Sequence, residues 1–284
     1  MPSEASSNTP RTRLGGNSTE VDRERLLTSD NPDSGDHRYR DDSGPAQPGV
    51  EVLFSTNVEM GADEESQVKP EGRPGDGWAR NLAFAGVGIL AITTWFTILS
   101  NDPAHYGWFA LHPPMQSLAL CFFTYGVMTL QPTSQPKTKA AGFIRHQTAV
   151  FYFGFSIIFL GTLAAVIHKT IHDMNQFQTW HAKFGLLCIV WLVGQVFLGA
   201  GSVWNGGSLF GRGMKAKALW KYHRLSGYIL FALMMFTAHL GGVWSGWAAT
   251  FVSAPVGLVA YTVAPAAIVI GVWSRVRTSK MQFR

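Results

Sequence analysis

The sequence predicts an all-α membrane protein with six transmembrane helices, and three observations lead to this prediction. Charged residues make up only 14% of the 284 residues, compared with roughly 25% in globular proteins. Almost all acidic residues precede Asp76, and Asp102 and Asp173 are the only acids between Asn81 and Ser274. This acid-poor part contains six apolar runs, each near the length of about 20 residues that a helix needs to cross a bilayer. A soluble globular enzyme is therefore excluded for this part of the chain.

Residues 1–78 are predicted to be a disordered cytosolic tail. The tail is rich in Ser, Asp, Glu, Arg, Gly and Pro, so it buries too little apolar surface to offset the entropy lost on ordering. It contains no basic start followed by an apolar run, so no cleaved signal peptide is expected. Its segment Asp22–Leu27, DRERLL, resembles an acidic dileucine sorting signal. The alternative is a chance occurrence in a charged tail.

The six spans are placed at the apolar runs, with Pro, Gly and Asn clustered in the gaps between them. Runs of this length must be helices, because backbone polar groups find no partner in hydrocarbon. A six-helix domain is therefore expected at 79–277, followed by a short cytosolic C-terminus at 278–284. The predicted spans are about Asn81–Leu99, Phe109–Leu130, His146–His168, His181–Trp204, His223–Trp244 and Ala254–Ser274.

Lysine and arginine predict how the spans are oriented. Only Lys169 and Lys183 belong to the three connections on one side of the membrane. Since basic residues concentrate in cytosolic segments, both termini are predicted to be cytosolic. The same asymmetry explains the pI of about 9.3 without a nucleic-acid partner. The basic residues on the opposite, cytosolic side are Lys69, Arg73, Arg80, Lys137, Lys139, Arg145, Arg212, Lys215, Lys217, Lys221, Arg224, Arg275, Arg277, Lys280 and Arg284.

Only two cysteines occur, Cys121 and Cys188, and both lie inside apolar runs. This excludes a disulfide framework, a CxxC zinc site and a CxxCH haem attachment.

Four of the nine histidines stand at the predicted starts of spans 2 to 5, namely His112, His146, His181 and His223. Because successive helices alternate in direction, spans 2 and 4 start outside and spans 3 and 5 start in the cytosol. We therefore expect two facing pairs in a central four-helix bundle, His112 with His181 and His146 with His223. Ionisable residues in membranes usually face the bundle interior and serve a function. The alternative for each one is an interfacial histidine at a helix end.

Two pairs of imidazoles predict two b-type haems in this bundle. The core lacks the paired carboxylates of a di-metal site and the thiolates of an iron–sulfur cluster. Bis-imidazole ligation needs two neutral histidines facing each other and leaves no open axial position, which suits electron transfer. Gly185 and Gly227 lie one helical turn after His181 and His223 on the same face, which leaves room for a flat macrocycle.

The remaining histidines are alternative ligands, although none of them forms a matched pair. His168 is expected at the outer boundary of span 3, and His239 nearly opposite the ligand of span 5. His105 and His172 are expected in outer loops, and His37 lies in the tail.

Several short motifs surround the four histidines. They are Leu111–Met115 (LHPPM), Arg145-His146, Trp180–Gly185 (WHAKFG) and Tyr222–Tyr228 (YHRLSGY). With these motifs, residues 79–277 resemble the cytochrome b561 family of six-helix, two-haem transmembrane oxidoreductases. The segment Val166–Lys169 (VIHK) is similar to the branch called b561 domain-containing proteins.

The resemblance implies an ascorbate-dependent ferrireductase or monodehydroascorbate reductase, in which His112 and His181 ligate the outer haem and His146 and His223 the cytosolic haem. Electrons would pass from cytosolic ascorbate, or a similar small reductant, to monodehydroascorbate or a ferric chelate outside. The residues expected on the donor side are Lys137, Lys139, Arg145, Lys217, Lys221 and Arg224, and those on the acceptor side are His105, His168, Lys169 and His172.

One departure from the family pattern leaves the donor open. Ascorbate-using members are expected to have a lysine nearer the position of Ala141. The resemblance also implies a homodimer as one possible state, in an endomembrane, the vacuolar membrane or the plasma membrane.

Three alternatives remain at this point. A quinol-linked cytochrome would keep both haems and change the donor. A histidine-lined transporter or proton pathway would normally have acidic partners at mid-depth, and none is present. A non-catalytic scaffold or sorting protein would act through the tail and bind no haem.

Overall fold

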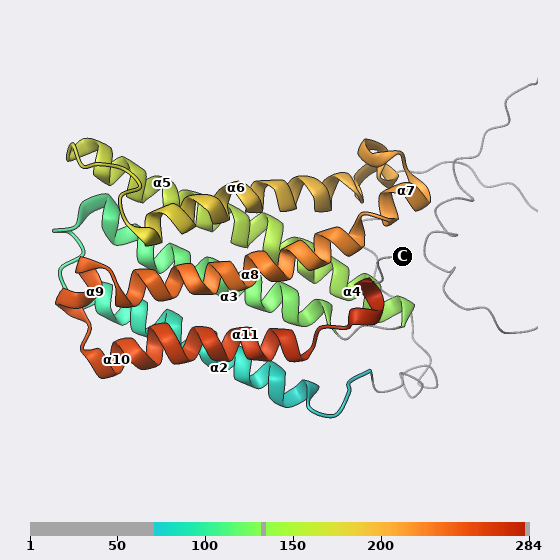
Figure 1. Cartoon of the computed structure of the whole chain (residues 1–284), viewed down its shortest axis with the longest axis horizontal. Coiled ribbons are helices and arrows are strands. Elements are labelled where there is room, and N and C mark those ends of the chain that lie inside the picture. Colours follow the sequence, from blue (N-terminus) through green and yellow to red (C-terminus); the bar gives the residue numbers. More distant parts are fainter. Residues whose placement is uncertain (1–70, 132–134, 282–284) are drawn as a thin grey trace, which may run out of the picture. The chain divides into compact units, whose positions relative to one another are not determined.

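The computed structural model describes residues 71–131 and 135–281, and every regular element within these ranges is a helix (Figure 1). The sorting-type segment Asp22–Leu27 lies outside the described residues, as does most of the predicted tail. The long helices are α2 (Asp76–Leu99), α3 (His112–Leu130), α6 (Trp180–Gly201) and α8 (Trp220–Val243).

Two further long runs are each composed of several elements in direct succession. They are α4 (Pro136–His146), η3 (Gln147–Phe155) and α5 (Ser156–Ile171), and then α10 (Ala254–Leu258), η6 (Val259–Val263) and α11 (Ala264–Ser274); η3 and η6 are π-helical. The short elements are η2 (Gly107–Leu111), η4 (Trp204–Gly206), η5 (Ser208–Phe210), α7 (Gly213–Lys217), α9 (Gly246–Phe251) and η7 (Thr278–Met281).

Five helices among the described residues are long and apolar enough to cross a membrane: Asp76–Leu99, Pro136–Ile171, Trp180–Gly201, Gly213–Val243 and Ala254–Ser274. The second span predicted from the sequence, now α3, is not among the five. Its 19 residues begin with His112 and two prolines, followed closely by Gln116 and Ser117, so its first turns lower its mean hydropathy.

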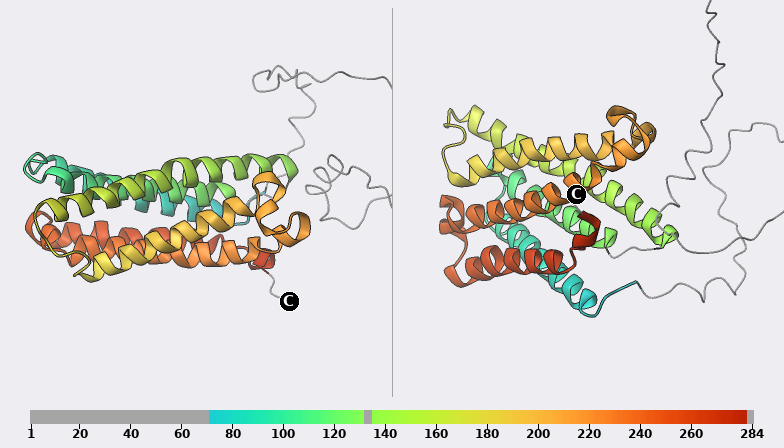
Figure 2. Two further views of the ribbon diagram at one scale, coloured as in Figure 1. Left: turned by 90° about the horizontal axis from the view of Figure 1, so that it is seen from above. Right: turned by 45° about the vertical axis from the view of Figure 1, so that its right-hand side comes forward.

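Successive long helices run antiparallel and side by side, so that their ends gather at two opposite ends of the helical assembly (Figures 1 and 2). We call one of these the basic end, where α4 and α8 begin and η7 lies. The other is the neutral end, where η2, α9 and the start of α10 lie. The predicted cytosolic cations of the described residues are at the basic end, whereas Lys169 and Lys183 are at the neutral end.

Three helices start earlier than predicted. Helix α2 begins at Asp76 instead of about Asn81, His146 is the last residue of α4, ten residues after Pro136, and His223 is the fourth residue of α8. The preceding segments contain lysines and arginines, so hydropathy places the start of each span too late. These residues nevertheless form helices, and Pro136 occupies a first-turn position that proline tolerates.

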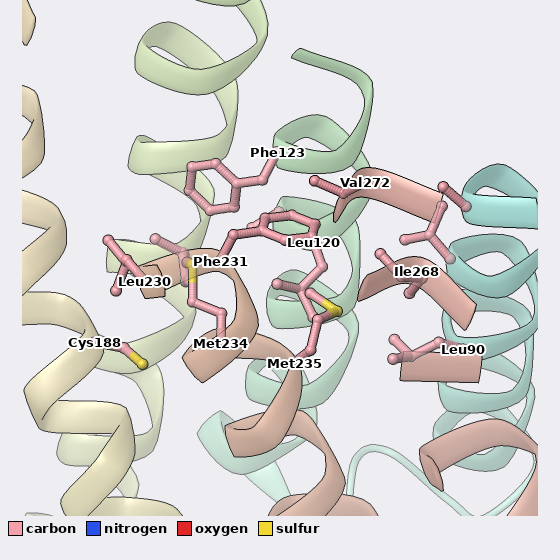
Figure 3. Packing of buried hydrophobic residues seen from close by; sticks show 14 of the residues in the cluster. Leu90, Leu120, Phe123, Cys188, Leu230, Phe231, Met234, Met235, Ile268 and Val272 are labelled. Atoms are coloured by element: carbon pink, nitrogen blue, oxygen red, sulfur yellow. The ribbon is translucent and has the colours of Figure 1, made fainter. Parts of the chain in front are cut away.

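Buried apolar side chains from several helices form one core cluster, which includes Leu120 and Phe123 of α3, Phe231 and Met235 of α8 and Ile268 of α11 (Figure 3). Helices α2 and α11 pack especially closely, because a Cβ on Gly86 would lie 2.8 Å from the backbone oxygen of Ala264. Small residues permit such backbone approach between membrane helices.

The other four long helical runs form two layers. Close backbone contacts join α3 to η3 and α5, and separately join α6 to α8. Among the described residues, close backbone contacts between these two layers are few. The four histidines predicted as ligands are distributed over the two layers and face each other between them.

Candidate functional site

The structure brings the four histidines together in two pairs. The ring centroids of His112 and His181 are 6.0 Å apart with an interplanar angle of 83°, and those of His146 and His223 are 6.4 Å apart at 87°. A metal–imidazole bond is about 2 Å long, so two imidazoles on opposite sides of one metal have centroids about 6 Å apart. Both pairs therefore have the separation that bis-imidazole ligation requires.

Backbone carbonyls orient three of the four rings. The Nδ1 atoms of His112 and His181 each donate a hydrogen bond of 2.9 Å, to the carbonyls of Gly161 and Thr237 respectively. The Nδ1 of His146 donates to the carbonyl of Gly126 at 3.3 Å. Because a carbonyl can only accept, Nδ1 is protonated in each ring and Nε2 keeps its lone pair. Metal-binding histidines are usually oriented in this way.

His223 is the exception. Its Nδ1 is buried without a hydrogen-bond partner. The backbone carbonyl of Gln195 lies beside this ring, but no well-formed hydrogen bond joins them. The orientation of His223 is therefore less firmly fixed than that of the other three rings.

The four carbonyls follow a regular spacing. In three helices the carbonyl lies fourteen residues after a histidine of the same helix: Gly126 after His112, Gln195 after His181 and Thr237 after His223. Fourteen residues of helix span about 21 Å, so each helix holds an imidazole of one pair and faces an imidazole of the other pair.

The remaining helical run has a spacing of fifteen residues, from His146 to Gly161. The π-helical η3 lies directly between these two residues. A π-bulge inserts one residue into an α-helix and is frequent at functional sites. The extra residue is accommodated there, and Gly161 still faces His112.

Glycines make space for two of the imidazoles. A Cβ on Gly199 would lie 2.9 Å from Cε1 of His223, and a Cβ on Gly241 would lie 2.8 Å from Cε1 of His181. Gly185 and Gly227, which were expected from the sequence to leave room for a flat macrocycle, have looser surroundings. A Cβ on Gly185 would meet its nearest atom at 3.9 Å, and one on Gly227 at 3.7 Å, so space remains beside both helices at these positions.

The other histidines lie outside the two pairs. The ring of His239 bonds through Nδ1 to the carbonyl of Tyr261 and approaches the Thr262 hydroxyl, so it packs against η6. His105 packs edge-on against the neighbouring Tyr106 at the neutral end. His168 and His172 lie together at the end of α5.

The six predicted donor-side cations all lie at the basic end, on α4, α7 and α8: Lys137, Lys139, Arg145, Lys217, Lys221 and Arg224. The structure adds Arg277 and Lys280 of the C-terminal segment, which sequence reasoning treated only as topology signals. Arg224 Nη1 donates to the carbonyl of Lys280 at 3.1 Å.

Lys280 lies among other positive charges at the basic end. Desolvation by surrounding protein atoms lowers the pKa of Lys280, although its side chain keeps contact with solvent. The cations Arg224, Lys139 and Arg277 lower this pKa further, while Glu71 acts in the opposite direction. A cluster of this kind favours an anion.

The buried guanidinium group of Arg275 connects several helices at the basic end. Arg275 is only 3% exposed, and its Nε lies 4.0 Å from the carboxylate of Asp76. Its Nη2 donates to the carbonyl of Gln131, whose side chain bonds to the Tyr228 hydroxyl. Burial lowers the pKa of Arg275, and Asp76 opposes this effect. These contacts connect α11, α2, α3 and α8 near His223.

The fold and the site together define a multi-pass helical membrane protein with two facing histidine pairs of the kind that hold haem. Residues 111–249 match the family described as eukaryotic cytochrome b561, and the chain therefore contains a domain of this family, as its motifs predicted. No curated protein matches the chain. The matched range includes all four paired histidines, and the family implies transmembrane electron transfer through haems and reductase activity.

Proposed function

We propose that the chain transfers single electrons across a membrane. The donor is ascorbate or a similar small reductant at the basic end, and the acceptor is monodehydroascorbate or a ferric chelate at the neutral end. The observation that supports this most strongly is the pair of facing imidazoles at each end of the same helices, with about 21 Å of helix between the two positions.

Two b-type haems are the cofactors that this donor set fits, one held by His112 and His181 and the other by His146 and His223. When bound, haem supplies the one-electron oxidation and reduction. In His112, His146 and His181 a backbone carbonyl keeps Nδ1 protonated, so that Nε2 would be free to bind the iron. Gly199 and Gly241 leave space for the imidazoles of His223 and His181.

In this proposal six helices cross the bilayer, namely the five long apolar helices and α3. It begins at the neutral end and ends at the basic end, as its neighbours do in alternation (Figure 1). The positive-inside rule then makes the basic end cytosolic, together with both termini.

The basic end attracts the donor electrostatically. Ascorbate is an anion at neutral pH, and Arg224, Lys139, Arg277 and Lys280 form a positive cluster close to His223. Such a field raises the local concentration of an anionic donor and speeds its encounter with the protein.

The test uses the full chain purified in detergent. We would measure haem per chain as the pyridine haemochrome and record reduced-minus-oxidised spectra with ascorbate. Two b-type haems reduced by ascorbate are expected. If only a quinol reduced the two haems, the donor would be a quinol instead of ascorbate. One haem per chain would require new ligand pairs. A folded preparation without haem would overturn the proposal and favour a scaffold.

A further inference from the structure

The last long helical run is interrupted in the half that is nearer the neutral end. Pro265 of α11 has no N–H group, so it cannot donate to the carbonyl of Tyr261 four residues before it, and its ring crowds that carbonyl. The backbone is π-helical over Val259–Val263, directly before α11. Such bulges are rare and are frequent at functional sites. The carbonyl of Tyr261 is therefore open to a donor from another helix.

His239 of α8 is that donor. Its Nδ1 lies 2.9 Å from the carbonyl oxygen of Tyr261 and 3.1 Å from the hydroxyl oxygen of Thr262. Because a carbonyl can only accept, Nδ1 carries the proton and donates it to this bond. His239 thus replaces the backbone donor that Pro265 lacks, in a membrane-spanning helix where an unsatisfied carbonyl is costly.

Tight packing around Tyr261 surrounds this hydrogen bond. Gly242 lies three residues after His239 on the same face of α8, and a Cβ on it would overlap the ring of Tyr261. The hydroxyl of Tyr261 is 3.1 Å from that of Thr94 in α2, which itself donates to the carbonyl of Leu90. A shift or rotation of α8 against η6 would break these contacts.

The opposite face of the same part of α8 orients His181. The carbonyl of Thr237 accepts the 2.9 Å hydrogen bond from Nδ1 of His181, and Gly241, one turn later, leaves space for this ring. His239 follows Thr237 by two residues, which is about 200° around a helix of 3.6 residues per turn. One side of α8 is thus fixed to η6, and the other side holds an imidazole of the neutral-end pair.

We propose that His239 is a positioning residue for the neutral-end haem site. Its hydrogen bond to Tyr261 fixes α8, and α8 in turn fixes the Thr237 carbonyl that orients His181. The inference rests on the proposed function in one respect, namely that His112 and His181 hold a haem. A hydrogen bond at Nδ1 fixes an imidazole and raises its basicity as a ligand. Loss of the anchor therefore loosens His181 and favours the reduced form of the neutral-end haem, whereas the pair at the basic end keeps its surroundings.

The first experiment compares three replacements of His239 in the full chain purified in detergent. His239→Ala removes the donor, His239→Asn places an amide nitrogen at the position of Nδ1, and His239→Gln places one at the position of Nε2. His239→Ala and His239→Gln should keep both haems while the midpoint potential of one haem rises, and His239→Asn should restore the unmodified value. Potentiometric titration followed by optical spectra measures these potentials.

Electron paramagnetic resonance of the oxidised protein gives a second readout of the same variants. The low-spin ferric signal depends on the angle between the two imidazole planes, so one of two signals should move in His239→Ala and return in His239→Asn. Repeating His239→Ala together with His223→Ala, in which the neutral-end site alone would hold haem, identifies the haem that changes. A change confined to the basic-end haem would overturn the inference.

The second experiment uses Pro265 as the partner of His239. Pro265→Ala supplies the missing backbone donor. In this background, His239→Ala should raise the potential less and lower the thermal unfolding temperature less than it does in the unmodified chain. Such non-additivity is the sign of two residues that act on the same group.

Two outcomes of the second experiment would overturn the inference. They are equal effects of His239→Ala in both backgrounds and an unchanged potential in His239→Ala. If the chain held no haem but the thermal effects were still non-additive, the anchor between α8 and η6 would stand and the proposed function would fail.

Discussion

The two histidine pairs consist of the same residue type but have different surroundings. At the neutral end, both Nδ1 atoms donate hydrogen bonds of 2.9 Å to backbone carbonyls. At the basic end, His146 bonds at 3.3 Å and the Nδ1 of His223 has no partner. Hydrogen bonding at the second ring nitrogen fixes an imidazole and raises its basicity as a ligand. The comparison teaches that the donor set alone does not determine the properties of a site.

Charge separates the two pairs further. Arg145 and Arg224 stand directly beside His146 and His223 in the chain, and both are half-buried. At the neutral end the nearest basic neighbour in sequence is Lys183, whose ammonium group lies 5.0 Å from the Trp180 ring. The charge of Lys169 also acts on His112 and His181, so one lysine there stands against two arginines at the basic end. Positive charge stabilises the reduced form of a metal centre, and weaker ligand basicity acts in the same direction. We therefore expect the higher midpoint potential at the basic end.

The largest expected effect comes from removing a ligand at either end. His181→Ala and His223→Ala should each lower the haem content from about two per chain to about one, because a haem that would be held by one imidazole instead of two binds less tightly. The pyridine haemochrome of the purified variants measures this. His239→Ala is the control and should keep both haems, since its ring packs on η6. A variant that lost both haems at once would show that the two sites are not independent.

The next effect concerns the space around the imidazoles. Gly241→Ala and Gly199→Ala would place a Cβ 2.8 Å and 2.9 Å from the rings of His181 and His223, so each should reduce haem occupancy at its own end. In Gly194→Ala, by contrast, the added Cβ would meet nothing within 4 Å. Alanine is also the better helix former by about 1 kcal/mol. Haem content and thermal stability of the three variants give the comparison, and equal behaviour of all three would refute it.

The sequence was sufficient to predict the pairs, because helix alternation alone brings His112 towards His181 and His146 towards His223. It was not sufficient to predict the orientation of the rings. The acceptors are backbone carbonyls, which every residue has, so no residue type marks the carbonyl of Thr237 or of Gly161. The π-helical segment is equally invisible to hydropathy, because inserting one residue leaves the run apolar.

Other differences have similar causes. The basic segment before His146 forms the first turns of a long helix, although its charges resemble those of a loop. Arg277 and Lys280 join the donor side only because the chain returns to the basic end after α11. Such long-range contacts leave no mark in the spacing of residues along the chain.

Removing one charge tests the electrostatic difference between the two ends. Arg224→Gln should lower one midpoint potential by tens of millivolts, since a unit charge at about 10 Å contributes on the order of 1 kcal/mol at an effective dielectric constant near 20. Lys183→Gln is the matched control at the neutral end. Its side chain is exposed, and screening by water makes its effect much smaller. Potentiometric titration followed by optical spectra measures both, and equal shifts would contradict the assignment of the higher potential to the basic end.

The smallest effect concerns the donor. Lys280→Gln should raise the KM for ascorbate about two- to fivefold, because exposed charge pairs contribute roughly 0.2–1 kcal/mol, and this difference should shrink at high ionic strength. Lys215→Gln, a change in α7 at the same basic end, is the matched control and should leave KM unchanged.

The lowered pKa of Lys280 adds a pH dependence that the control Lys215→Gln should keep and that Lys280→Gln should lose. A lysine with a lowered pKa loses its proton, and with it the charge that attracts the anion, at a lower pH than an ordinary lysine does. The KM for ascorbate should therefore start to rise at a pH below the usual lysine range in the unmodified protein and in Lys215→Gln. In Lys280→Gln that rise should be absent. If the pH profile stayed the same in Lys280→Gln, this residue would not belong to the donor site. The C-terminal cations would then serve only to orient the chain in the membrane.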